Sequence, residues 1–169
     1  MVREHAYDPV MDRRHFSVAI GSPSELPSQL GLPEGDFACL VAWDARGESA
    51  ETISSPVAPL LRAGASHVVC WGPDCKRVHD ITDELASNPD NEFGIPKDSC
   101  IMTTWHSSEA SRVALWLFLM NSFSEEHYHD STHVALAIAV GSPPWALEIR
   151  EALDYPREFM ENGSEDGAA

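Results

Sequence analysis

The chain has 169 residues, of which 43% are hydrophobic and 22% are charged, as is typical of one globular domain with a sizeable core. Asp and Glu number 27 against 11 Lys and Arg, which gives a formal net charge of −16. Nucleic acids and anionic lipid surfaces are bound through clustered cations, so this balance argues against both as partners. A basic protein partner is compatible with it, and so is a surface whose charge only keeps the protein soluble.

We expect an irregular N-terminal segment over residues 1–36. Residues 15–20 have the composition of an edge strand, and residues 21–35 contain proline and glycine at the density of a loop. The first ten residues contain no apolar run, so the sequence predicts no secretory signal, and the longest apolar stretch, Val113–Met120, is too short to span a bilayer. Four cysteines without a signal indicate reduced thiols, and we expect a cytoplasmic protein.

From residue 37 onward, apolar strands alternate with helices. The expected strands cover residues 37–43, 67–71, 100–105 and 134–140. Each is followed by a helix, and the expected N-caps are Ser55, Asp74, Ser107 or Ser108, and Ser142. Pro56 and Pro143 suit the first helical position, and Pro156 is expected to end the last helix.

This alternation predicts the fold class. A strand, a crossover helix and another strand imply parallel pairing through right-handed connections. We therefore expect a three-layer α/β sandwich, Rossmann-like or flavodoxin-like, with a mostly parallel sheet of four or five strands over residues 37–156. Residues 157–169 are expected to form a frayed acidic tail. The pattern does not determine the order of the strands.

Tryptophans mark the expected carboxyl ends of the strands, which is where open parallel sheets bind ligands. An aromatic wall with few polar groups is the usual composition of a small-molecule pocket. The sequence therefore predicts a site for a nucleotide-like or sugar-like ligand at this rim. The alternative is that each tryptophan only closes the core against its neighbouring helix. The predicted ligand-binding residues are Trp43, Arg46, Trp71, Asp74, Trp105 and Trp145.

Three residues of the same rim are candidates for catalysis, namely Cys75, His106 and Asp44. Cys75 is expected in the first turn of a helix beside two cationic residues, where the helix dipole and the cations favour a thiolate. Such a nucleophile needs a base, which His106 or His79 would supply, while Asp44 would orient the substrate or act as a base. The alternative for Cys75 is an inert, partly buried thiol.

The other cysteines and the histidines suggest no metal or cofactor site. Cys39, Cys70 and Cys100 lie in expected apolar strands and are predicted to be core residues. His127, His129 and His133 form a tract that precedes a strand, at the opposite rim, so we expect a solvated loop there and not a metal site. The chain has no Gly-x-Gly-x-x-Gly turn, no Walker lysine and no Gly-x-Ser-x-Gly elbow, so no cofactor is predicted.

Three turns also carry a resemblance to a family. Trp-Asp-Ala-Arg-Gly, Trp-Gly-Pro-Asp-Cys and Thr-Thr-Trp-His, in this order, are similar to turns of bacterial proteins that share a domain of unknown function. The resemblance extends from about Phe37 to Trp145 and implies a recurring domain, with no activity to transfer. Two functions therefore follow from the residues. One is a small-molecule site at the carboxyl rim, with or without turnover; the other is a non-catalytic acidic factor, such as an immunity or accessory protein, that covers a basic partner.

Overall fold

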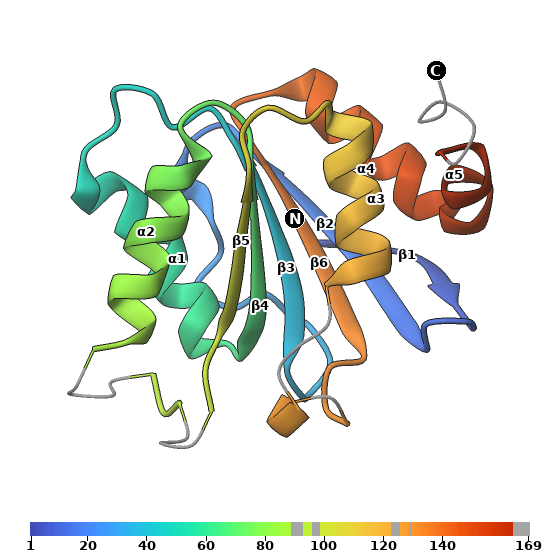
Figure 1. The fold of residues 1–169 in the computed structure, drawn as a ribbon, viewed down its shortest axis with the longest axis horizontal. Helices are drawn as coiled ribbons and strands as arrows, with labels where there is room; N and C mark the ends of the chain where they lie inside the picture. The colour runs from blue at the N-terminus through green and yellow to red at the C-terminus, as the bar shows by residue number, and fades with distance from the viewer. Residues whose placement is uncertain (89–92, 96–98, 123–125, 129, 164–169) are drawn as a thin grey trace.

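The computed structural model of the protein describes residues 1–88, 93–95, 99–122, 126–128 and 130–163 (Figure 1). These residues form a six-stranded sheet in the order β1-β2-β6-β3-β4-β5. The β1–β2 pair is antiparallel, and the four other neighbouring pairs are parallel. The strands are β1 (Arg3–Asp8), β2 (Arg13–Ile20), β3 (Phe37–Trp43), β4 (Ala65–Trp71), β5 (Met102–His106) and β6 (Val134–Val140).

Helices cover both faces of the sheet, as Figure 1 shows, with α1 and α2 on one side and α3, α4 and α5 on the other. This arrangement confirms the predicted α/β class with a mostly parallel sheet, although the sheet has six strands and not four or five. In the described ranges, no helix is long and apolar enough to cross a bilayer. The helices are α1 (Ala50–Arg62), α2 (Cys75–Ala86), α3 (Ser111–Asn121), α4 (Pro143–Asp154) and α5 (Pro156–Gly163), with short 3₁₀ turns η1 (Pro23–Glu25) and η2 (Glu126–Tyr128).

The two central strands, β3 and β6, are buried at every position, which explains their unbroken apolar sequences. Alternate residues of β6 face opposite layers. Leu136 and Ile138 belong to the core beneath α1 and α2, whereas the three alanines of β6 belong to the core beneath α3 and α4. These alanines pack in one buried cluster with residues of α4, which include Ile149 and Leu153.

The N-terminal 36 residues contain β1 in addition to the strand expected at residues 15–20, which is β2. β2 does not lie at the edge of the sheet, since it pairs with β1 on one side and β6 on the other. Its alternate polar residues Arg13, His15 and Ser17 suggest a strand at an edge, yet all three are buried. At the other end of the chain, residues 157–163 belong to α5, and residues 164–169 of the expected tail lie outside the described residues.

Two helices start at different residues from those predicted. α1 begins five residues before the expected cap, and the Ser49 hydroxyl accepts a hydrogen bond from the Thr52 amide at 3.0 Å. The earlier start brings Ile53 into the apolar stripe of the helix, where it is fully buried, even though Pro56 then lies inside the helix. α3 begins at Ser111 and not after Ser107 or Ser108.

The starts of α2 and α4 are confirmed, but the two caps work differently. Ser142 caps α4 by accepting a hydrogen bond from the Trp145 amide. Asp74 precedes α2 in a left-handed conformation with φ of 62°, and its side chain caps no amide. Its carboxylate pairs instead with Arg77 at 2.9 Å.

Gly72 directly follows β4, and its backbone lies very close to the end of β3. A Cβ added there would lie 2.5 Å from the Trp43 carbonyl oxygen, and φ is +114°. We expect Gly72→Ala to lower the free energy of unfolding by about 3 kcal/mol or more, since backbone strain and overpacking add. Gly47→Ala is the matched control, because Gly47 also has a positive φ but a Cβ there would meet no atom within 4 Å. Denaturant unfolding that finds equal losses for both variants would contradict the close approach.

Candidate functional site

The strand order places a topological switch point between β3 and β6. From β3 the chain continues through β4 to β5 in one direction, and then returns through α3 to β6 on the other side of β3. The following helices leave in opposite directions, with α1 on one face and α4 on the other (Figure 1). In open α/β sheets, ligands bind in the crevice that this divergence opens beyond the carboxyl ends of the strands.

A cavity of about 560 Å³ occupies this crevice. Its walls come from the ends of β3 and β6, from the start of α4 and from the segment that follows β2. Four of the predicted site residues are among its lining, namely Trp43, Asp44, Arg46 and Trp145. The other lining residues were not among the predicted site residues, and they are Gly21, Ser22, Pro23, Glu48, Val140, Gly141 and Ser142.

Asp44 and Arg46 form a two-bond ion pair at the mouth of the cavity. The Arg46 guanidinium donates to both carboxylate oxygens of Asp44, from Nε at 2.8 Å and from Nη2 at 2.6 Å. These hydrogen bonds lower the pKa of Asp44 below its usual value. Asp44 is therefore a carboxylate that accepts hydrogen bonds and a weak base for proton abstraction. The pairing also uses two of the five N–H groups with which Arg46 would hold an anion.

Arg77 holds the loop that carries Asp44. Its Nη1 donates to the Glu48 carbonyl at 2.6 Å and its Nη2 donates to the Ala45 carbonyl at 2.8 Å. The same guanidinium pairs with Asp74, so α2 and the β3–α1 loop are tied together. Arg77 is one of the two cationic residues that follow Cys75, and its contacts with Ala45 and Glu48 span about thirty residues, so no local pattern predicts them.

The tryptophans at this rim have two different roles: some line the cavity, and one fills space in the core. Trp43 and Trp145 line the cavity. Trp71 packs edge-on against Trp145 at 4.6 Å between ring centroids, and its indole N–H donates to the Glu109 carbonyl at 2.9 Å. The void between these two rings and α3 is only about 10 Å³, so Trp71 closes the core, as the alternative interpretation expected.

Trp105 lies away from the cavity. Its ring is 45% exposed and packs against His79, with 4.5 Å between ring centroids, while the Lys76 ammonium lies 5.5 Å from the centre of the indole. Asp74, which pairs with Arg77, is also absent from the cavity lining. The predicted ligand-binding set is therefore split between the crevice and the ends of β4 and β5.

The surroundings of Cys75 disfavour the predicted thiolate. The residue is only 1% exposed, and burial raises the pKa of its thiol above the usual value, although hydrogen bonds from backbone N–H groups act in the opposite direction. The ring of His106 faces Glu109, with Nδ1 and Oε1 3.6 Å apart. Neither Cys75 nor His106 lines the crevice that contains Asp44, so the three catalytic candidates do not form one site.

The predictions for the remaining cysteines and histidines are confirmed only in part. Cys39 and Cys70 are buried in strands as predicted, but Cys100 precedes β5 and is exposed. His133 is exposed and contacts Asp12 at 3.2 Å, whereas His129 and the side chain of His127 lie outside the described residues. Within the described residues, no three His, Cys, Asp or Glu side chains are grouped to hold a metal ion.

The fold and the crevice define an α/β protein with a mostly parallel sheet and a cavity at its switch point. Residues 17–156 match the family model described as a domain of unknown function (DUF7684), and the chain belongs to this family. No match was found among curated proteins.

Removing the Arg77 side chain tests whether it holds the loop. We expect Arg77→Ala to lower the free energy of unfolding by about 1–3 kcal/mol, because two carbonyl groups lose a charged donor. Hydrogen exchange at the amides of residues 45–48 should also become faster. Lys76→Ala is the matched control, since its ammonium pairs with the exposed Asp80 and we expect a loss of less than about 1 kcal/mol. Unchanged exchange in Arg77→Ala would contradict this role.

Alkylation of the native protein should follow exposure. We expect iodoacetamide to modify Cys100 first, because it is the exposed cysteine of the four, while Cys39, Cys70 and Cys75 react only after unfolding in urea. Peptide mass mapping at successive times measures the order. Fast modification of Cys75 in the folded protein would restore the interpretation of Cys75 as an activated thiol.

Proposed function

We propose that the crevice between β3 and β6 binds a small, hydroxyl-rich molecule of the size of a sugar. The observation that carries the proposal is the cavity of about 560 Å³ at the switch point, where an aromatic wall meets carboxylates. Trp43 and Trp145 supply apolar ring surface, and Asp44 and Glu48 supply acceptors for ligand hydroxyl groups.

The charges of the crevice favour hydroxyl groups over phosphate, which narrows the predicted ligand from nucleotide-like to sugar-like. The N-terminus of α4 is a poor phosphate site because Pro143 and Pro144 have no N–H group. The next amide, that of Trp145, already donates to the Ser142 hydroxyl. With Asp44 and Glu48 at the mouth, an anionic ligand would also be repelled.

The strand order supports assigning a Rossmann-like core to residues 37–140. Counted along the chain from β3, the four strands β3, β4, β5 and β6 lie in the spatial order 3-2-1-4. This is the order on either side of the switch point in doubly wound dinucleotide-binding sheets. The fifth parallel strand, β2, comes from the N-terminus and lies beyond β6. We propose the similarity for the core alone, without the glycine-rich phosphate turn.

A ligand panel tests the proposal. Intrinsic fluorescence and thermal melting would be measured with D-glucose, D-ribose, N-acetylglucosamine and myo-inositol, and with AMP and inorganic phosphate as anionic comparisons. We expect at least one of the neutral polyols to quench the fluorescence saturably and to raise the melting temperature, while phosphate does neither. Asp44→Asn should weaken binding by about tenfold, as expected for the loss of a hydrogen bond to a charged group.

Variants of single tryptophans show which ring gives the fluorescence change on ligand binding. Trp43→Phe and Trp145→Phe should remove most of the quench because these rings line the crevice. Trp116→Phe is the matched control, since Trp116 lies on α3, outside the cavity lining. The proposal would be wrong if no polyol bound, or if the response persisted in both crevice variants and disappeared in the Trp116 variant.

A further inference from the structure

A second cavity, of about 550 Å³, lies on the other side of β6, between β2 and α4. It shares Gly21, Gly141 and Ser142 with the crevice, but most of its lining is different. Apolar residues such as Ile20 and Ile149 form much of its wall. The polar side chains that line it are those of Arg3, Ser17, Ser142 and Arg150.

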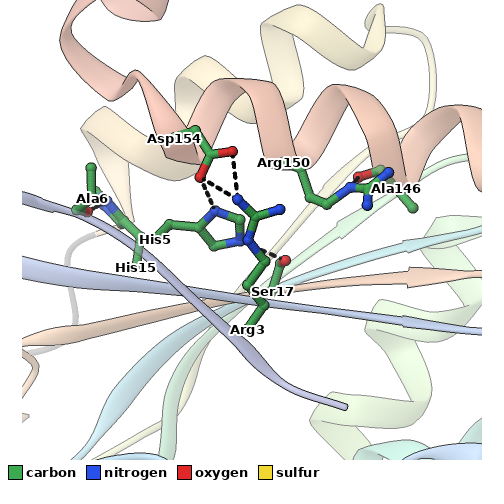
Figure 2. Close-up of polar contacts among 8 residues, drawn as sticks. All are labelled: Arg3, His5, Ala6, His15, Ser17, Ala146, Arg150 and Asp154. Carbon is green, nitrogen blue, oxygen red and sulfur yellow. Dashed lines mark hydrogen bonds and ion pairs between the residues drawn. The ribbon is translucent and has the colours of Figure 1, made fainter.

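Ser17 belongs to a hydrogen-bonded chain of three side chains (Figure 2). His5 lies between the other two, with its Nε2 2.7 Å from the Ser17 hydroxyl and its Nδ1 2.7 Å from a carboxylate oxygen of Asp154. The residues come from β1, β2 and the last position of α4. The imidazole is fully buried, so solvent does not compete for either hydrogen bond.

The charge on Asp154 determines which atoms donate and which accept in this series of hydrogen bonds. The hydrogen bond from His5 lowers the pKa of Asp154 below its usual value, so the group is a carboxylate that only accepts hydrogen bonds. His5 Nδ1 must therefore donate to it. In a neutral imidazole, Nε2 is then the unprotonated nitrogen, and it accepts the hydrogen bond of the Ser17 hydroxyl. This is the protonation state in which histidine removes a proton from serine.

We propose that Ser17 is the nucleophile of an esterase site that opens into this second cavity, with His5 as its general base and Asp154 as the residue that positions His5. The substrate class is a carboxylic ester with a small apolar acyl group, which the apolar wall of the cavity accommodates. The proposal goes beyond sugar binding at the crevice and rests on different side chains.

The proposed reaction proceeds in two halves. Ser17 Oγ forms a bond to the ester carbonyl carbon while its proton moves to His5 Nε2, and the carbonyl electrons move to oxygen. The intermediate then breaks the bond to the alcohol, which leaves with the proton from Nε2. Water attacks the acyl carbon in the same way, with His5 Nε2 accepting its proton, and the bond from the acyl carbon to Ser17 Oγ then breaks as that proton passes to Oγ. A carboxylic acid leaves, and Ser17 is regenerated.

Arg3 is placed to stabilise the oxyanion. It lies directly opposite Ser17 in the β1–β2 pair, so the two side chains project from the same face. Its Nη2 donates to both oxygens of Asp154, at 3.1 and 2.9 Å. The three other N–H groups of the guanidinium, on Nε and Nη1, can serve the cavity that Arg3 lines.

A fluorophosphonate probe tests the nucleophile directly, since it phosphonylates an activated serine and releases fluoride. We expect the intact mass of the native full chain to rise by one adduct, and peptide mapping to place that adduct on Ser17. Ser17→Ala should remove the adduct, whereas Ser108→Ala, which changes an exposed serine, should retain it. Because mapping uses the unaltered protein, it gives a result even if a variant fails to fold. No adduct, or an adduct on another serine, would overturn the proposal.

Two measurements distinguish a catalytic role of His5 from a merely structural one, namely the rate of ester hydrolysis and the protonation of its ring nitrogens. Hydrolysis of p-nitrophenyl acetate should fall by about 100-fold or more in His5→Ala, as expected for the loss of a general base, and added imidazole should restore part of the rate. His133→Gln is the control at an exposed histidine and should leave the rate unchanged.

The ¹⁵N spectrum of the imidazole should show a protonated Nδ1 in the native protein and a change of tautomer in Asp154→Asn. Equal rates for the native protein and His5→Ala, or a native ring protonated on Nε2 alone, would show that the three residues only join β1, β2 and α4.

Discussion

The insertion of β6 between β2 and β3 is the constraint on which the rest of the molecule depends. β6 pairs with each neighbour over seven residues, so the last strand among the described residues joins β2 to β3. Its burial on both faces contributes much of the hydrophobic stabilisation of the sheet. Both cavities exist because of this insertion, since one lies between the ends of β6 and β3 and the other between β6, β2 and α4.

The two cavities differ in how their polar groups are arranged. In the crevice, Asp44 and Arg46 form an exposed ion pair, and exposed pairs of this kind contribute little to stability. They are therefore free to exchange their partner for a ligand at small cost. Beside the second cavity, His5 is fully buried and bonded at both ring nitrogens, so it is held in one orientation. The first arrangement suits binding, and the second suits a reaction that needs a fixed geometry.

The crevice and the Ser17–His5–Asp154 chain also differ in their position relative to the family domain. The matched range, residues 17–156, includes every residue that lines the crevice. It includes Ser17 and Asp154 as well, but His5 and Arg3 precede it. Sugar binding is thus proposed from residues inside the family domain, whereas esterase activity depends on the N-terminal strand of this chain.

The sequence by itself determined the layers of the fold and the rim that carries a cavity. Continuous apolar runs such as residues 37–43 and 134–140 are typical of strands covered on both faces, and their alternation with helices indicates parallel pairing. Local signals of this kind also located Trp43, Asp44, Arg46 and Trp145 at the carboxyl ends of strands. They placed a strand at residues 15–20 but at the edge of the sheet, and they missed β1, whose sequence contains no apolar run.

Only the tertiary structure decided which side chains meet. The separation of Cys75 from Asp44, the closing of Trp71 against Trp145 and the strand order all depend on packing between distant segments. The contacts of His5 with Ser17 and Asp154 span 12 and 149 residues of the chain, and no local spacing encodes the second of them. The physical reason is that the hydrophobic periodicity of a sequence shows which face of a helix or strand is buried. A polar site depends instead on which helices and strands pack against one another, and local periodicity does not contain that information.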